Sequence, residues 1–245
     1  NGSLIFHVNF TSKRSKHTAT PQSSAKLQGI LYRPRLGYAH PIRSLQSYEY
    51  LVFCCVIDAD MFGIINLGKP AGPTSRDCVN HIQRIVRPVK VGHAGTLDPI
   101  ASGVLLILVG QASRLTDYVH NLDKEYIGTF QLGVMSPSAD TETEVTIVPD
   151  APVPTLEDLV KNLSLFRGTI SQTPPIYSAL RIDGKRAYDL ARAGETPVIP
   201  SRQVTISELE IVSYVYPRLV LRIACSTGTY IRSIGRDTVS YTHLT

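Results

Sequence analysis

The stretch KVGHAGTLDPIASG at 90–103, followed directly by the apolar run VLLILV at 104–109, decides how the rest of the chain is arranged. Its three glycines let the backbone approach a ligand closely. Asp98 precedes Pro99, which pushes the Asp98 backbone toward extended geometry and stiffens it. A carboxylate on a stiff loop beside a buried strand is suited to act as a nucleophile or an acid–base group. An Asp-Pro pair is also a common turn start, and composition alone favours that simpler interpretation.

Strands and helices are both predicted on either side of this stretch. They alternate without a regular strand–helix–strand rhythm, and Asp183-Gly184 predicts a tight hairpin. The pattern indicates an α+β fold with a mixed, largely antiparallel central sheet flanked by helices. The predicted strands are 62–67, 104–109, 126–134, 204–212 and 218–225, and the predicted helices are 75–87, 111–122, 155–166 and the end of 226–237.

Local signals support several of these assignments. Thr74 followed by Asp77, and Thr155 followed by Asp158, have the spacing of helix-capping pairs. The second predicted helix places Leu115, Tyr118, Val119 and Leu122 on one inward face. The acidic, Ser/Thr-rich stretch 136–144 is predicted to be a loop.

Composition excludes several classes of protein. The 245 residues are 43% hydrophobic and 18% charged, which rules out a wholly disordered or fibrous chain. No apolar run approaches the roughly 20 residues that span a bilayer. The four cysteines contain no C-x-x-C pair and the histidines have no metal-ligand spacing, so neither a zinc knuckle nor a dithiol site is indicated. Sparse cysteine suits a reducing compartment.

Residues 1–60 differ from the rest of the chain. They hold seven Lys/Arg and three Asp/Glu, whereas residues 61–245 hold 18 and 17, so most of the net charge of +5 lies in this leader. Any nucleic-acid binding by 61–245 must therefore use a local patch. The leader composition resembles a transit peptide. We favour the alternative that Met61 is the true start and that 1–60 is a disordered, non-native leader, because patterned sequence begins at Met61.

A partial nucleotide-binding motif lies at the start of the patterned region. Gly63, Gly68 and Lys69 satisfy the first seven positions of the P-loop pattern, but the eighth is Pro70. Proline removes the hydroxyl that would hold Mg²⁺ and breaks the expected helix start, so a P-loop nucleotidase is nearly excluded.

The stretch 90–99, KVGHAGTLDP, resembles the signature of the TruB family of tRNA pseudouridine(55) synthases. Five further segments match in the family's order, and the short start at Met61 looks more like the bacterial stand-alone enzyme. They are GIINLGKPAGPTS at 63–75, ASGVL at 101–105, KEY at 124–126, PPIYSALRIDGKRAY at 174–188 and GTYIR at 228–232.

The resemblance implies a reaction and its partners. The family cleaves the N1–C1′ bond of a uridine in the tRNA T-loop, turns the base over and rejoins it through C5. No redox step or group transfer occurs, so the resemblance implies no cofactor and no metal. The implied partner is the T-stem-loop of tRNA, with no membrane, and the expected form is a cytoplasmic monomer.

The resemblance also implies the site residues. Asp98 matches the catalytic aspartate, and Arg232 matches the arginine that pairs with it and keeps it ionised. Tyr126 matches the tyrosine that stacks on the target base and is implied to help remove the C5 proton. His93 matches the histidine that contacts the flipped nucleotide and supports the disturbed loop, and Tyr230 matches a residue that lines the uridine pocket. Lys69, Lys90, Arg114 and Lys124 are candidate phosphate contacts. A flipped base requires such an aromatic platform near the carboxylate.

Two departures from the family pattern affect these expectations. Gly68 stands where the family usually has Asp before the lysine. After Asp237 the family pattern is lost, and 238–245 is expected to be a non-native tail that ends an incomplete catalytic domain at 61–237. The alternative function is therefore an RNA-binding or RNA-chaperone module without turnover. Asp98, Tyr126 and Arg232 together favour the enzyme, because binding alone needs no paired carboxylate and cation.

Overall fold

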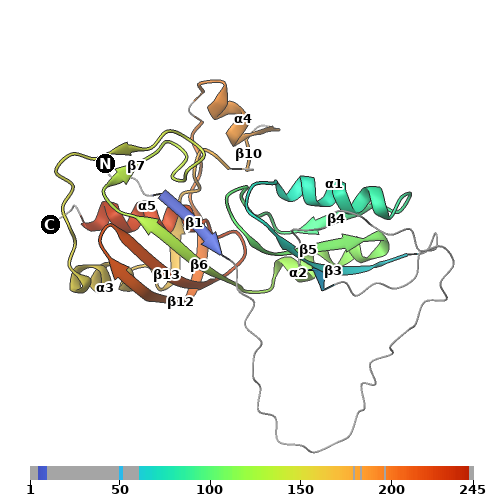
Figure 1. Cartoon of the computed structure of the whole chain (residues 1–245), viewed down its shortest axis with the longest axis horizontal. Coiled ribbons are helices and arrows are strands. Elements are labelled where there is room, and N and C mark those ends of the chain that lie inside the picture. Colours follow the sequence, from blue (N-terminus) through green and yellow to red (C-terminus); the bar gives the residue numbers. More distant parts are fainter. Residues whose placement is uncertain are drawn as a thin grey trace, which may run out of the picture.

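Two antiparallel sheets lie side by side in the computed structural model (Figure 1). It describes residues 5–9, 50–51 and 61–242 except 179, 183 and 196, with side chains described only between 61 and 238. Helices pack on both sheets, so the predicted α+β class is confirmed. Every described strand pairing is antiparallel, and the two separate sheets replace the single mixed sheet expected from sequence.

The larger sheet has the strand order β1-β6-β13-β12-β9. Alternate residues of β13, such as Leu219, Leu221 and Ile223, are fully buried, as the period of two requires. The elements are β1 (Ile5–Asn9), β6 (Lys124–Gln131), β9 (Gly168–Gln172), β12 (Arg202–Val215) and β13 (Arg218–Cys225), with α3 (Leu156–Ser164) and α5 (Ile231–Thr242) beside them.

The smaller sheet has the order β2-β3-β5-β4, and helix α1 lies beside it. Its central strand β5 is the buried run expected from sequence: Leu105, Ile107 and Leu108 are almost wholly inaccessible. The elements are β2 (Tyr50–Leu51), β3 (Gly63–Lys69), α1 (Ser75–Ile85), β4 (Val91–Ala94), β5 (Gly103–Val109), the 3₁₀ helix η1 (Gly110–Leu115) and α2 (Thr116–His120).

Two short hairpins and one helix complete the fold. Strands β10 and β11 pair Ile182 with Lys185, on either side of the predicted hairpin turn, in which Asp183 lies outside the described residues. The elements are β7 (Val134–Met135), β8 (Thr146–Ile147), β10 (Arg181–Ile182), β11 (Lys185–Arg186) and α4 (Ala187–Arg192).

Both predicted capping pairs are present. Thr74 Oγ1 accepts a hydrogen bond from the Asp77 backbone N–H at 3.1 Å, and the Asp77 carboxylate accepts from the Thr74 N–H at 2.9 Å. Thr155 and Asp158 repeat this geometry at the start of α3. Each reciprocal pair satisfies backbone donors that the first helical turn leaves free.

The predicted helix at 111–122 is wrong in form and in its buried face. The chain makes a 3₁₀ helix and then one short α-helix, so the 3.6-residue period is not maintained. Leu115, Tyr118 and Leu122 are consequently exposed instead of turned inward.

The predicted leader lies mostly outside the described residues. Within it, β1 pairs with β6 and β2 pairs with β3, each antiparallel. The prediction that 1–60 is a disordered, non-native leader therefore stays a prediction, as does the boundary at 237.

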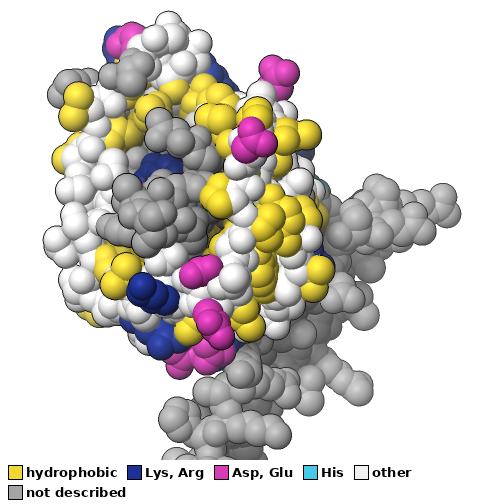
Figure 2. Space-filling model, turned by 90° about the vertical axis from the view of Figure 1, so that its left-hand side faces the viewer, with side chains coloured by type: hydrophobic (Ala, Val, Ile, Leu, Met, Phe, Trp, Pro, Cys, Tyr) yellow, Lys and Arg dark blue, Asp and Glu magenta, His cyan; other side chains and the backbone are white. Residues whose placement is uncertain are grey.

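Hydrophobic side chains gather on the face that carries α3 (Figure 2). Leu156 and Val160 in α3, and Leu165 just after it, are each more than half exposed.

Candidate active site

The loop that carries Asp98 is held in place from several sides. Ser75 Oγ exchanges hydrogen bonds of 3.0 Å with the backbone N–H and C=O of Leu97. The Gly72 N–H donates to the Pro99 carbonyl at 2.8 Å. The backbone is therefore fixed immediately before and after Asp98, which sets the direction of its side chain.

Lys69 completes this clamp. Its side chain is 1% exposed, and its ammonium donates to the carbonyls of Pro70, Pro99 and Ala101 at 3.0, 3.2 and 2.6 Å. The prediction that Lys69 contacts RNA phosphate is therefore corrected, because this buried ammonium is already satisfied by carbonyls. Lys69 instead holds the turn that follows Asp98.

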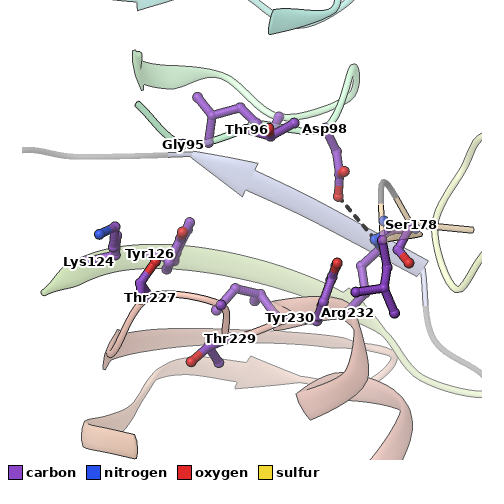
Figure 3. Close-up of a pocket in the computed structure, with 15 residues that line it drawn as sticks. Gly95, Thr96, Asp98, Lys124, Tyr126, Ser178, Thr227, Thr229, Tyr230 and Arg232 are labelled. Atoms are coloured by element: carbon purple, nitrogen blue, oxygen red, sulfur yellow. Dashed lines mark ion pairs between the residues drawn. The ribbon is translucent and has the colours of Figure 1, made fainter. Parts of the chain in front are cut away.

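Arg232 connects the two sheets at the site. It lies near the start of α5, and its Nε is 3.0 Å from Asp98 Oδ2 (Figure 3). The side chain is 5% exposed. Its Nη1 also donates to the Ser138 carbonyl at 2.9 Å, and its Nη2 donates to the Tyr177 carbonyl at 3.0 Å. The guanidinium is thus fixed beside Asp98, as the resemblance implies.

A second carboxylate on Arg232 was missed by the sequence analysis. Asp140 is wholly buried, and its Oδ2 accepts from Arg232 Nη1 at 2.9 Å. Its Oδ1 accepts from the Ser138 hydroxyl and from the Glu142 N–H. It lies in the stretch 136–144, whose Ser/Thr-rich acidic composition is typical of an exposed loop. Only the tertiary contact with Arg232 distinguishes Asp140 from its acidic neighbours.

Asp98 faces a cavity of about 320 Å³ between the two sheets. Tyr126 of β6 and Tyr230 line it together with Asp98 and Arg232 (Figure 3). Tyr230 is held through its backbone by the buried Gln172, whose amide accepts from the Tyr230 N–H at 2.7 Å and donates to its carbonyl at 3.0 Å. The guanidinium of Arg202 lies 4.8 Å from the centre of the Tyr230 ring. Gln172 and Arg202 were not identified from sequence.

Burial shifts the pKa values of two side chains at the site. It raises the pKa of Asp98 above the ordinary 3.8; Arg232 opposes this rise and Asp140 adds to it. Arg232 thus acts on the pKa of Asp98 in the implied direction, while burial and Asp140 act against it. Burial also raises the pKa of the Tyr126 phenol, which stays protonated at neutral pH. Asp98 is the only carboxylate among the described residues that line this cavity.

A second cavity of about 510 Å³ meets the first at Asp98, Arg232 and Ser178. His93 lines this second cavity and not the first. Its Nδ1 contacts the Gly95 carbonyl, and burial lowers the pKa of its imidazole. Arg186 and Arg192 lie over the ring of Tyr188 at 5.7 and 5.3 Å, on the same cavity wall. Cations and aromatic rings suited to phosphates and bases therefore adjoin the carboxylate.

The remaining predicted phosphate contacts are divided between two places. Lys124 lines the first cavity, but its ammonium donates to backbone carbonyls at the end of α2, including that of His120 at 2.6 Å. Lys90 and Arg114 line a separate hollow away from Asp98.

Among the described residues, no three His, Cys, Asp or Glu side chains are grouped so that they would hold a metal ion. None of the helices in the described ranges combines the length and hydrophobicity needed to span a bilayer.

The two antiparallel sheets meet at the pair of the partly exposed Asp98 carboxylate and the buried Arg232 guanidinium, an arrangement that fits a pseudouridine synthase-like protein. A model described as "TruB family pseudouridylate synthase (N terminal domain)" matches residues 83–231. The chain belongs to the TruB family.

Curated relatives agree with this assignment. The chain is 46% identical over 180 residues to "tRNA pseudouridine synthase B" of Trichormus variabilis, covering 72% of this chain and 61% of the relative. It is 42% identical over 181 residues to the protein of that name in Rhodopirellula baltica, covering 71% and 52%. The chain thus spans between half and two thirds of the length of these relatives.

Solved structures agree as well. The "Crystal Structure of a Cbf5-Nop10-Gar1 Complex" contains a chain with a TM-score of 0.55 and 28% identity, covering 74% of this chain and 44% of that one. A structure of an H/ACA RNP bound to a substrate RNA containing 2'-deoxyuridine has a TM-score of 0.52 and 25% identity, covering 74% and 43%.

Proposed function

We propose that this protein isomerises a uridine in the T-loop of tRNA to pseudouridine, with Asp98 as the acting carboxylate. The observation that carries the proposal is the 3.0 Å pair of Asp98 and the buried Arg232 at the wall of an aromatic-lined cavity. A surface that only binds RNA needs no carboxylate there, since a negative charge repels phosphate. The name of the curated relatives supports the tRNA substrate.

The residues support a cofactor-free isomerisation. The N1–C1′ bond breaks, the base turns over, the C5–C1′ bond forms, C5 loses a proton and N1 gains one, so the atoms balance within the substrate. Asp98 is placed to attack C1′ or to assist departure of the base. The Tyr126 ring offers a stacking surface for the target base, and burial raises the pKa of its phenol. Arg232 holds Asp98 in the attacking position.

The second cavity accommodates the RNA backbone on either side of the extruded nucleotide in this proposal. The target base has to leave its stack to reach Asp98. Arg186 and Arg192 offer charge to phosphates, while Tyr188 and Tyr177 offer aromatic surface. We further propose a monomer in a reducing, cytoplasmic compartment; the buried free thiols of Cys78 and Cys225 support the compartment.

The decisive experiment compares wild type with Asp98→Asn on a T-arm hairpin. The variant keeps the size of the side chain but offers a neutral amide, so it should bind RNA within about twofold of wild type and form no pseudouridine. Asp150→Asn is the matched control, because Asp150 is exposed. Turnover by a folded Asp98→Asn protein would remove Asp98 from the mechanism. A wild-type chain that binds the hairpin without forming pseudouridine would support the RNA-binding alternative.

A further inference from the structure

A hollow of about 650 Å³ lies at the end of the smaller sheet that is remote from Asp98. Strand pairing gives the distance between Asp98 and the hollow. Lys69, which holds the Asp98 loop, pairs with Gly103 at one end of β5. Val109, at the other end of β5 beside the hollow, pairs with Gly63 and Val91. Six residues of β5 separate these ends, or about 20 Å at roughly 3.3 Å per residue. The hollow is therefore distinct from both cavities at Asp98.

The charged side chains that line the hollow are Lys90 and Arg114, and both are exposed. Within the described part of the chain, neither has a carboxylate within 4.0 Å. Gln111 and Ser113 add polar groups, and the ring of Phe62 is 61% exposed at the rim. Two cations, neutral polar groups and an exposed aromatic ring match the phosphates and bases of RNA.

The backbone beneath the hollow is rigidly built. Gly110 has φ of 57°, and a Cβ there would lie 2.3 Å from the Met61 carbonyl oxygen. Its N–H donates to the Lys90 carbonyl at 2.8 Å. The Gln83 side-chain amide donates a hydrogen bond to the Val89 carbonyl and accepts one from the Val91 N–H, and these two residues flank Lys90. Lys90 and Arg114 are thus carried on fixed segments, which lowers the entropy lost on binding.

We propose that this hollow binds phosphates of the substrate RNA beyond the modified loop. The inference rests on the proposed function for the identity of the RNA. A base seated at Asp98 leaves the hollow about 20 Å away along β5, so the nucleotides next to the target base do not fill it, and a whole tRNA offers more phosphates at that distance than a short hairpin does. Residues 61–245 have a low net charge, so Lys90 and Arg114 supply a large part of the electrostatic attraction between this region and RNA.

The test measures affinity of the full chain for an unmodified tRNA transcript and for a T-arm hairpin at several salt concentrations. Lys90→Ala/Arg114→Ala should weaken tRNA binding roughly 5- to 20-fold, and should reduce the salt slope of log affinity by about 1.5. Hairpin binding should fall by a smaller factor than tRNA binding does. The control Lys161→Ala/Arg218→Ala removes the same charge from exposed positions of the other sheet and its helix, and should leave both affinities within twofold.

The inference is overturned if the double variant binds tRNA as the control does, if hairpin binding falls equally, or if wild type binds neither RNA. An acidic protein as the true occupant would give the first of these results. Pseudouridine formation by wild type on the hairpin is measured separately. Its absence would refute the proposed function, while the difference between tRNA and hairpin affinity would still decide the role of the hollow.

Discussion

Asp140→Asn tests whether the structure assigns the second carboxylate correctly. Asp140 is wholly buried and accepts from Arg232, from the Ser138 hydroxyl and from the Glu142 N–H. In the variant, the amide oxygen at position 140 best accepts the hydrogen bonds from Ser138 and Glu142. In that orientation the amide N–H groups point at the Arg232 guanidinium. Two donors then face each other in a site that excludes water.

The expected cost follows from these contacts. Removing one partner of a buried ion pair typically costs 3–5 kcal/mol. Arg232 keeps Asp98 at 3.0 Å and two backbone carbonyls, so we expect the lower end, about 3 kcal/mol. Urea unfolding at pH 7 measures this loss. Asp150→Asn, an exposed aspartate at positive φ that asparagine tolerates, should change the free energy of unfolding by less than about 0.5 kcal/mol.

The same variant should alter the pH dependence of catalysis in a defined direction. The negative charge of Asp140 raises the pKa of Asp98. Its removal should therefore shift the acid limb of single-turnover pseudouridine formation to lower pH, once any loss of folded protein is corrected. An unfolding free energy within about 0.5 kcal/mol of wild type, together with an unmoved acid limb, would refute the assigned role of Asp140.

Two other outcomes are expected. Lys69→Met should lower the free energy of unfolding, measured by urea titration, by about 2–3 kcal/mol because three carbonyls lose their donor. The variant should leave the salt dependence of RNA affinity unchanged. A salt slope reduced by about 1 would restore Lys69 as a phosphate contact. The pKa of Asp98 lies above 3.8, so the active carboxylate form should be lost as the pH falls through a value above 3.8; an acid limb at or below 3.8 in the wild-type rate profile would contradict the effect of burial.

The local elements were largely predictable because their causes are local. Buried strand β5 follows from an uninterrupted apolar run, and the caps of α1 and α3 follow from Thr and Asp at a spacing of three. The prediction failed at 111–122, where the spacing of apolar residues suggested one continuous helix. The chain instead forms a 3₁₀ turn directly after β5, which pairs with β3 and β4, and Tyr118 is exposed.

Sequence by itself determined the residue types of the site and, through the family motifs, the identity of Asp98, Tyr126 and Arg232. Tertiary structure alone decided which polar groups share each environment. Asp140 reaches Arg232 across 92 residues of chain, and Lys69 turns inward to carbonyls 30 and 32 residues away. A lysine or aspartate has the same local preferences whether it faces water or the interior. Its partner and its burial are therefore set by the folded arrangement of distant segments.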